Sequence, residues 1–423
     1  MLTAAENEML TRVGPGTPMG ELMRRYWHPV AAVSQFKEGI YTMRVRLLCE
    51  DLILYRDRSG TWGLMDPFCP HRRMSMMFGV PETEGLRCAY HGWLFDENGK
   101  CLEMPYEETE DPDSGFKDKV TIKTYPAQEY AGMVFAYLGP LPAPLLPPFD
   151  LYVMEDVLRD IGYAELKCNW LQAQENSLDP VHVEWLHQHF TNYVMERMGR
   201  SDLQRPPTKH AKISFDAFEY GIIKRRVVEG GSDEDDDWKH GHPALFPNYL
   251  RQGGGSNKGR SSGGGFQIRV PIDDVTTAHW WYRCYPMVEG DKPQAAKDIP
   301  YYTVPCPDLD ENGQPGWDVM DNNSGQDITA WITQGQIADR TQETLGRSDR
   351  GIIMYRQQLR DALKDIAEGR DPMCVFRDPS VKRVDFATES AARFAAGGAQ
   401  RQRGGAATKY SPILIAREGE VKY

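Results

Sequence analysis

The stretch CPHRRMSMMFGVPETEGLRCAYHGW, residues 69–93, decides how the chain is interpreted. It contains two short pairs of metal-binding side chains separated by sixteen residues: Cys69 with His71, and Cys88 with His91. Two Cys and two His can bind zinc, but zinc fingers group the two Cys on one turn and the two His together. Here each pair offers one thiolate and one imidazole. That mixture favours a two-iron cluster in which one iron binds both thiolates and the other binds both imidazoles.

The order C-P-H followed by C-x-Y-H-G-W resembles the ligand motif of the Rieske proteins. The resemblance implies an all-β Rieske domain with one [2Fe–2S] cluster bound by Cys69, His71, Cys88 and His91. Neutral imidazoles lower the negative charge of such a cluster and raise its reduction potential. The alternative from a different class is a zinc-stabilised binding module.

The chain has 423 residues, which is more than one hydrophobic core usually serves. Strand-like runs at 43–57 and 120–140 follow a helical segment that ends near residue 25. Five prolines then fall within residues 138–150, where neither a helix nor a central strand can continue. We therefore predict two domains: residues 1–150, the Rieske domain with its N-terminal helical segment, and residues 151–423.

The second domain is expected to carry the catalytic site. Strand-like runs at 212–230 and 264–286 predict an antiparallel sheet, and helical patterns at 168–190 and 326–369 predict helices that flank it. The fold class predicted for the whole chain is therefore α+β.

The charge and composition exclude several classes of partner. Acidic residues exceed basic ones by 61 to 49, a net charge of −12, which disfavours binding to nucleic acid or to an anionic membrane. No run of eighteen apolar residues occurs, and the N-terminus lacks the apolar core of a signal peptide. The eight cysteines are spread over a long chain and suggest reduced thiols. We therefore expect a cytoplasmic protein.

A second set of ligand types lies in NWLQAQENSLDPVHVEWLHQHF, residues 169–190. His182 and His187 are five residues apart, so an ideal helix would point them about 140° away from each other. They converge on one ion only at a helix end or where the helix widens to a π turn. Two His and one carboxylate form the facial triad of non-haem iron(II) oxygenases. Asp179, which precedes Pro180, serves equally well as a helix N-cap.

The pattern N-x-x-D-x-x-H-x-x-x-x-H, which is Asn176, Asp179, His182 and His187, resembles the iron-binding stretch of the Rieske ring-hydroxylating oxygenases. In that family a distant carboxylate opens a helix and precedes a Trp by four residues. Asp327 in GQDITAW matches this pattern, with Asp321 in reserve, and an N-cap role is the alternative for Asp327. The segments around it resemble the phthalate-dioxygenase-like branch, whose oxygenase has only α subunits.

The resemblance implies a terminal oxygenase with one Rieske cluster and one mononuclear Fe(II), which uses O2 and electrons from a separate NAD(P)H-dependent reductase or ferredoxin. No nicotinamide or flavin fingerprint occurs in the chain. Asp179 and Asn176 are the catalytic residues expected from the motif. By resemblance, Asp179 links His91 of one subunit to His182 of the next, within a homotrimer or a dimer of trimers.

The expected reaction is hydroxylation, by cis-dihydroxylation, of a carboxylated aromatic substrate. Oxidative O- or N-dealkylation is the alternative, and a non-catalytic Rieske electron-transfer protein is the alternative from another class. Strand alternation places Ile223, Arg225 and Val227 on one face, so Arg225 is a candidate to bind a substrate carboxylate. Equally, Lys224, Arg225 and Arg226 together could form a solvated strand edge.

Overall fold

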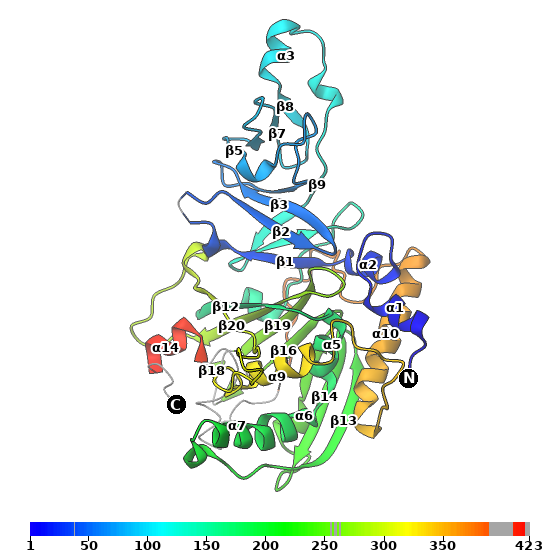
Figure 1. Cartoon of the computed structure of the whole chain (residues 1–423), viewed down its shortest axis with the longest axis vertical. Coiled ribbons are helices and arrows are strands. Elements are labelled where there is room, and N and C mark those ends of the chain that lie inside the picture. Colours follow the sequence, from blue (N-terminus) through cyan, green and yellow to red (C-terminus); the bar gives the residue numbers. More distant parts are fainter. Residues whose placement is uncertain (38, 254–255, 258–259, 262–263, 389–408, 419–423) are drawn as a thin grey trace.

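The computed structural model describes residues 1–423 apart from 38, 254–255, 258–259, 262–263, 389–408 and 419–423. Small sheets built from residues 27–137, here called the three-sheet part, lie at one end of the long axis (Figure 1). A large sheet with helices, here called the eight-stranded part, forms the other end. The predicted α+β class is confirmed.

The three-sheet part is antiparallel throughout the strand pairs that the structure describes. One sheet has the order β1 (Trp27–Ala32), β11 (Met133–Tyr137), β10 (Ala127–Tyr130). The next has the order β2 (Thr42–Leu47), β3 (Glu50–Arg56), β4 (Trp62–Met65), β9 (Thr124–Tyr125). The last has the order β5 (Val80–Pro81), β6 (Leu86–Arg87), β7 (Leu94–Phe95), β8 (Cys101–Glu103). Short helical elements join them: η1 (Val33–Gln35), η2 (Met76–Phe78), α3 (Pro105–Glu110) and η3 (Lys117–Lys119).

The eight-stranded part has the strand order β13 (His210–Phe218), β14 (Gly221–Val228), β15 (His242–Leu245), β16 (Tyr249–Gln252), β19 (Gly264–Pro271), β20 (Thr277–Pro286), β12 (Val157–Leu166), β21 (Tyr301–Thr303). Seven of these eight strands pair antiparallel, as predicted, whereas β21 pairs with β12 in parallel. A separate hairpin consists of β17 (Ser256–Asn257) and β18 (Arg260–Ser261).

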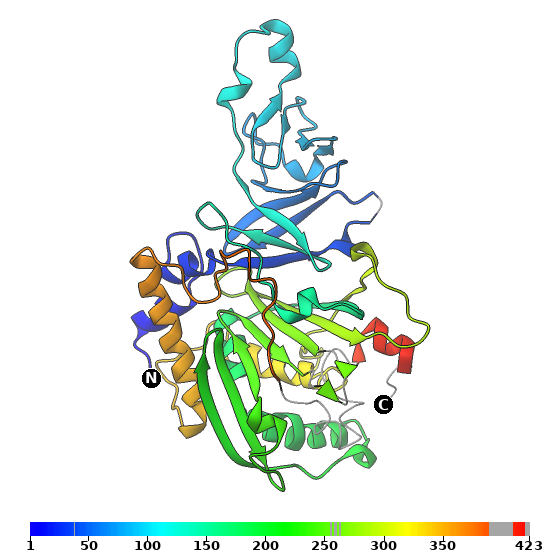
Figure 2. The same ribbon diagram turned by 180° about the vertical axis from the view of Figure 1, so that it is seen from behind.

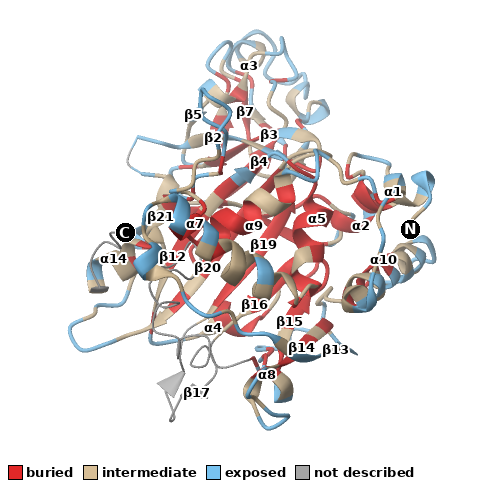
Figure 3. Cartoon of the chain, turned by 60° about the horizontal axis from the view of Figure 1, so that its bottom comes forward, coloured by how far each residue is buried: buried red, intermediate tan, exposed pale blue. Residues whose placement is uncertain are grey.

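Helices lie against one face and along the sides of this sheet (Figures 1 and 2), and α5 (Trp170–Glu175) and α9 (Asn323–Ile332) are among the most buried of them (Figure 3). The chain between them contributes η4 (Asn176–Leu178), α6 (His182–Glu184), η5 (Trp185–Phe190), α7 (Thr191–Arg197), η6 (Ser201–Leu203), α8 (Asp236–Lys239) and η7 (Ala296–Asp298). The others are α4 (Asp150–Val153), η8 (Arg347–Asp349), α10 (Arg350–Ala367) and α14 (Pro412–Glu418).

The N-terminal helices α1 (Ala4–Thr11) and α2 (Pro18–Met23) pack against the eight-stranded part, beside α10 (Figures 1 and 2). Asn7 of α1 donates a hydrogen bond to the Ala338 carbonyl (3.1 Å), and its Oδ1 accepts one from Arg340 (3.2 Å). Within the described residues, no helix is long and apolar enough to cross a membrane.

Candidate metal centres

Two loops of the three-sheet part are built alike, although they are distant in sequence. In each, the cysteine amide donates to the carbonyl five residues later, at 2.9 Å for Cys69 and 2.8 Å for Cys88. In each, the cysteine carbonyl accepts from the amide four residues later, at 2.9 Å from Arg73 and 3.0 Å from Gly92. Those donors have left-handed backbones, with φ of 59° at Arg73 and 78° at Gly92. Glycine adopts this conformation readily, whereas arginine does so at some cost.

The four side chains that these loops present differ in exposure. Cys69 and Cys88 are buried, and the imidazoles of His71 and His91 are exposed with ring centroids 4.4 Å apart. Burial raises the pKa of the Cys69 thiol to about 11, because an uncompensated thiolate is unfavourable in apolar surroundings. A nearby cation removes that penalty. This donor set therefore fits a Rieske cluster, with thiolates inside and imidazoles toward solvent.

His182 and His187 meet because the helix widens between them. The single turn of α6 continues into η5, which is a π helix, one of the two arrangements that the five-residue spacing allowed. The π turn brings His187 back toward His182, and their ring centroids lie 5.0 Å apart.

Asp327 reaches both imidazoles from α9. Its Oδ1 lies 3.2 Å from His187 Nε2 and 3.7 Å from His182 Nε2, and the donor atoms of the three residues lie within 4.8 Å of one another. Two imidazoles and one carboxylate at this separation fit one non-haem iron. Asp327 does not open the helix, and the alternative N-cap role is also wrong, because α9 begins after Asn322, whose side chain accepts from the Gly325 amide (3.1 Å).

Asp179 makes the backbone hydrogen bonds of a helix cap and also lies beside His182. One carboxylate oxygen accepts from the amides of Val181 (2.8 Å) and His182 (3.3 Å), as a helix cap does. The other lies 3.6 Å from His182 Nδ1. Burial opposes the charge of Asp179, but the His182 imidazole, the Val181 amide and the Lys224 ammonium together outweigh burial and lower the pKa of the carboxyl to about 2. Asp179 therefore stays ionised beside the group of three.

Asn176 and Asp321 lie outside that group. The Asn176 carbonyl accepts from the Asp179 amide (3.1 Å) and closes the turn between them. Among the described residues, the Asn176 side chain makes no hydrogen bond with either imidazole or with Asp327. Asp321, the reserve carboxylate, is fully buried and is held by Lys409 at 2.8 and 2.9 Å.

Gln326, which the sequence pattern does not single out, contacts the opposite end of the His187 ring. Its Oε1 lies 2.9 Å from His187 Nδ1, and its Nε2 donates to Thr191 Oγ1 (2.8 Å) and to the Met320 carbonyl (2.9 Å). The side chain is fully buried. The only signal in the sequence is a polar residue beside Asp327 within a helix, which many structural amides share.

One face of the large sheet carries positive groups toward this site. The strand register pairs Lys224 with His242 and Arg269 with His279, and alternation through the neighbouring strands places both pairs on the same face. The Lys224 Nζ lies 3.4 Å from the Asp179 carbonyl, so this face borders the group of three.

Arg269 is the most buried cation of that face. It is 1% exposed, its guanidinium lies 5.7 Å from the Trp331 ring of α9, and among the described residues its Nε has no hydrogen-bond partner. Burial lowers the pKa of Arg269 to about 9, while the Asp327 carboxylate favours its charge. Arg269 is therefore a buried positive charge on this face at neutral pH.

The expectation that Arg225 points into the site is wrong. Its guanidinium is held outside by Asp216 (2.6 Å) and by the Trp238 carbonyl (2.6 Å). The alternation along β14 runs the other way, since Lys224 and Arg226 are buried. The alternative of a solvated edge is also wrong, because β14 lies between β13 and β15.

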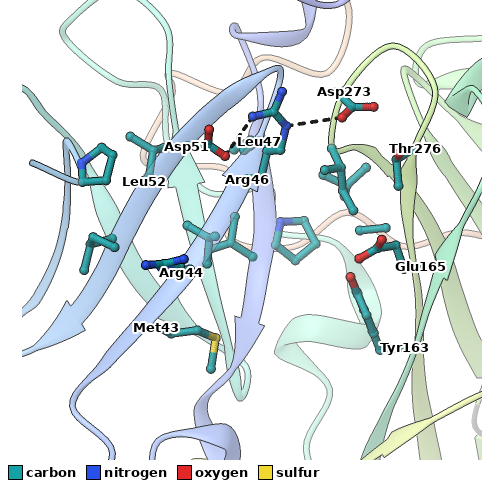
Figure 4. Close-up of a pocket in the computed structure, with 18 of the residues that line it drawn as sticks. Met43, Arg44, Arg46, Leu47, Asp51, Leu52, Tyr163, Glu165, Asp273 and Thr276 are labelled. Carbon is teal, nitrogen blue, oxygen red and sulfur yellow. Dashed lines mark hydrogen bonds and ion pairs between the residues drawn. The ribbon is translucent and has the colours of Figure 1, made fainter. Parts of the chain in front are cut away.

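A groove of about 640 Å³ lies between the two parts of the molecule (Figure 4). Arg46 of β2 pairs there with Asp51 (2.8 Å) and with Asp273 of the eight-stranded part (3.3 Å), and Tyr163 and Glu165 form the opposite wall. None of the predicted metal ligands lines this groove.

The chain has two sets of metal-binding residues: two Cys and two His of the kind that bind an iron–sulfur cluster, and a separate group of two His and one Asp. Together they define the class of protein, an iron–sulfur protein with a second, non-haem iron site. Comparison with known families agrees. Residues 26–126 match the model of the Rieske [2Fe-2S] domain, and residues 317–388 match that of the LigXa C-terminal domain like family.

Two curated relatives cover most of the chain. The 5,5'-dehydrodivanillate O-demethylase oxygenase subunit of Sphingobium sp. (strain NBRC 103272 / SYK-6) is 43% identical over 386 residues, 91% of this chain and 86% of the relative. The phthalate 4,5-dioxygenase oxygenase subunit of Pseudomonas putida is 32% identical over 408 residues, 87% of this chain and 88% of the relative. The solved structure of Pseudomonas putida CBB5 NdmA shares the fold, with a TM-score of 0.58, 19% identity, and 84% and 96% coverage of the two chains.

The chain therefore belongs to the Rieske oxygenases, as an oxygenase subunit. It is an enzyme whose cofactors are a Rieske [2Fe–2S] cluster and a mononuclear iron, as the resemblance implied.

Proposed function

We propose that this oxygenase subunit acts on an aromatic acid and that its reaction is oxidative O-demethylation. The observation that carries the proposal is the convergence of His182, His187 and Asp327 within 4.8 Å, in a chain that also has a Rieske domain. The 43% identity with an O-demethylase oxygenase subunit supports a methoxylated substrate. The reaction consumes an aryl methyl ether, O2, two electrons and two protons, and it yields a phenol, formaldehyde and water.

The ligand assignments follow from the donor sets. Cys69, Cys88, His71 and His91 hold the cluster. His182, His187 and Asp327 would hold the mononuclear iron, because the Nε2 atoms of both imidazoles face the Asp327 carboxylate. When bound, this iron supplies the activation of O2 beside the substrate.

The positive face of the sheet supports an acidic substrate. Lys224 and Arg269 lie on the face that borders the iron ligands, and both side chains are buried. A carboxylate bound there interacts strongly with these charges, because little water separates them. Lys224 replaces Arg225 as the candidate to bind that carboxylate.

A second candidate reaction is cis-dihydroxylation of an aromatic acid. It is supported by the 32% identity with a phthalate 4,5-dioxygenase oxygenase subunit over 87% of this chain. The same three ligands serve either reaction, so the products decide between them.

The proposal includes the partners and the assembly. Electrons come from a separate NAD(P)H-dependent reductase or from a ferredoxin, and a homotrimer or a dimer of trimers brings His91 of one subunit near Asp179 of the next. Both Asp179 and Asn176 are proposed as catalytic residues, and the enzyme is proposed to be cytoplasmic. The exposed imidazoles of His71 and His91 support transfer of electrons across a subunit contact.

The test is turnover of the purified subunit with a surrogate reductase, NADH and a panel of methoxylated and unsubstituted aromatic acids. Formaldehyde and a phenol in equal amounts are expected from methoxylated acids. A cis-diol from unsubstituted acids would favour the second candidate. Reduction of the cluster without any product from the panel, in protein that contains mononuclear iron, would contradict both.

A further inference from the structure

His187 is held at both ends of its ring by consecutive residues of α9. Asp327 lies 3.2 Å from Nε2, and Gln326 lies 2.9 Å from Nδ1. Neighbouring helical residues point about 100° apart, so one helix can contact both ends of a ring beside it.

The surroundings of Gln326 determine which end of its amide faces the imidazole. The Met320 carbonyl can only accept a hydrogen bond, so the amide atom 2.9 Å from it must be the nitrogen. The oxygen of the amide therefore faces His187, and an oxygen can only accept. It follows that Nδ1 of His187 carries a hydrogen, so Nε2, which lies on the side of Asp327, is the nitrogen left to bind a metal.

We propose that Gln326 is a positioning residue, which fixes His187 in the tautomer and ring orientation needed to bind the mononuclear metal. The inference rests on the proposed iron site and deepens it. Thr191 is part of the arrangement, because its hydroxyl accepts the second hydrogen of the amide (2.8 Å).

The two imidazoles have outer neighbours of different chemical type. Nδ1 of His182 lies 3.6 Å from a carboxyl oxygen of Asp179, whereas Nδ1 of His187 lies 2.9 Å from the amide oxygen of Gln326. A carboxylate partner makes an imidazole more electron-rich than an amide does. The amide at His187 therefore orients this metal ligand without placing a second carboxyl group beside the site. The carboxyl group of Asp179 lies beside His182 instead.

The first test compares metal affinity in two leucine variants. Gln326→Leu removes the acceptor from His187. Gln172→Leu is the matched control, because Gln172 is also buried, donates to two carbonyls (2.8 Å each) and contacts neither imidazole. Protein freed of mononuclear metal, with its cluster retained as judged by acid-labile sulfide, is dialysed anaerobically against Fe(II).

Gln326→Leu is expected to bind Fe(II) about 10- to 100-fold more weakly than wild type, the usual cost of losing an outer partner of a metal-bound histidine. Gln172→Leu is expected to stay within about threefold of wild type, since it affects stability only. Unchanged affinity in Gln326→Leu, or an equal loss in both variants, would overturn the proposal. If wild type itself bound no metal, the proposed function would fail instead.

A second variant keeps the test decisive if Gln326→Leu does not fold. Gln326→Glu keeps an oxygen that can accept the hydrogen bond from Nδ1. If the new side chain is protonated, it also reproduces the hydrogen bond to the Met320 carbonyl. If it is ionised, its negative charge attracts the bound Fe(II). It is expected to bind Fe(II) at least as tightly as wild type, and a loss as large as that expected for Gln326→Leu would refute the role.

A spectroscopic measurement reports the imidazole directly. With Cu(II) in the mononuclear site and the cluster oxidised, electron spin echo modulation detects the remote nitrogens of bound imidazoles. Wild type is expected to show two inequivalent remote nitrogens, of which one changes when Gln326 is replaced and neither changes in Gln172→Leu. Identical spectra in wild type and a folded Gln326 variant would contradict the proposed contact.

Discussion

Asp160 on β12 is a fully buried carboxyl that joins the C-terminal segment to the sheet. The Ser411 hydroxyl donates to one of its oxygens, and the Tyr285 hydroxyl lies 3.3 Å from the other. Burial raises the pKa of Asp160 from 3.8 to about 7, although these hydrogen bonds favour its charge. The folded protein therefore holds Asp160 neutral in mildly acidic solution, where the unfolded chain ionises it.

The sign and size of the effect follow from this difference. The neutral carboxyl stabilises the fold fully below pH 3.8, and the stabilisation is lost as the pH rises toward 7. One pKa unit corresponds to about 1.4 kcal/mol, so the whole contribution is about 4 kcal/mol. Between about pH 5.0 and 6.5, wild type is expected to lose about 2 kcal/mol of unfolding free energy on account of Asp160.

The assay compares wild type with Asp160→Asn, because asparagine cannot titrate. Urea unfolding of both proteins is followed by tryptophan fluorescence at the two pH values. The other groups titrate alike in both proteins, so the change in the difference between them isolates Asp160. The variant is expected to gain about 2 kcal/mol relative to wild type as the pH rises. Parallel stability curves would refute the reasoning.

Three further outcomes are expected. Asp179→Asn is expected to keep the helix cap and both metals but to lower turnover about 10- to 100-fold. Normal turnover in a variant that contains both metals would refute the proposed role of Asp179 as a bridge between subunits. Lys224→Met is expected to raise the KM for an aromatic acid about tenfold or more but not the KM for its methyl ester. Arg225→Met, the control, is expected to change neither KM. An equal rise in KM for the acid and the ester would contradict the proposal that Lys224 binds the carboxylate. Glu175→Gln leaves two buried guanidinium groups without their shared carboxylate. It therefore lowers the unfolding free energy by about 3–5 kcal/mol in urea denaturation, and a loss below about 1 kcal/mol would show that this network is not stabilising.

The metal site could be predicted in part because its geometry depends on local spacing. The spacing of five residues from His182 to His187 excludes a shared face on an ideal helix, and the π turn at Trp185–Phe190 is one of the two ways to bring the rings together. The third ligand depended on resemblance, because Asp327 is distant in sequence and lies within its helix instead of at its start.

What the sequence could not supply was the direction of strand alternation and the tertiary partners. Along β14, a shift of one residue exchanges the two faces, so Arg225 was assigned to the side that Lys224 occupies. Gln326 could not be recognised, because its role depends on a helix that is remote from His187. The division of the chain at residue 150 stays a prediction, and α1 and α2, which precede it, pack beside α10, which follows it.

The central claim is that one chain holds both a Rieske cluster and a separate mononuclear iron. The most direct test is the iron and acid-labile sulfide content of wild type and of Asp327→Ala after reconstitution with Fe(II). The account predicts about three irons and two sulfides per wild-type chain, and about two irons with two sulfides in the variant. The same iron content in both proteins, or a colourless zinc protein without sulfide, would contradict it.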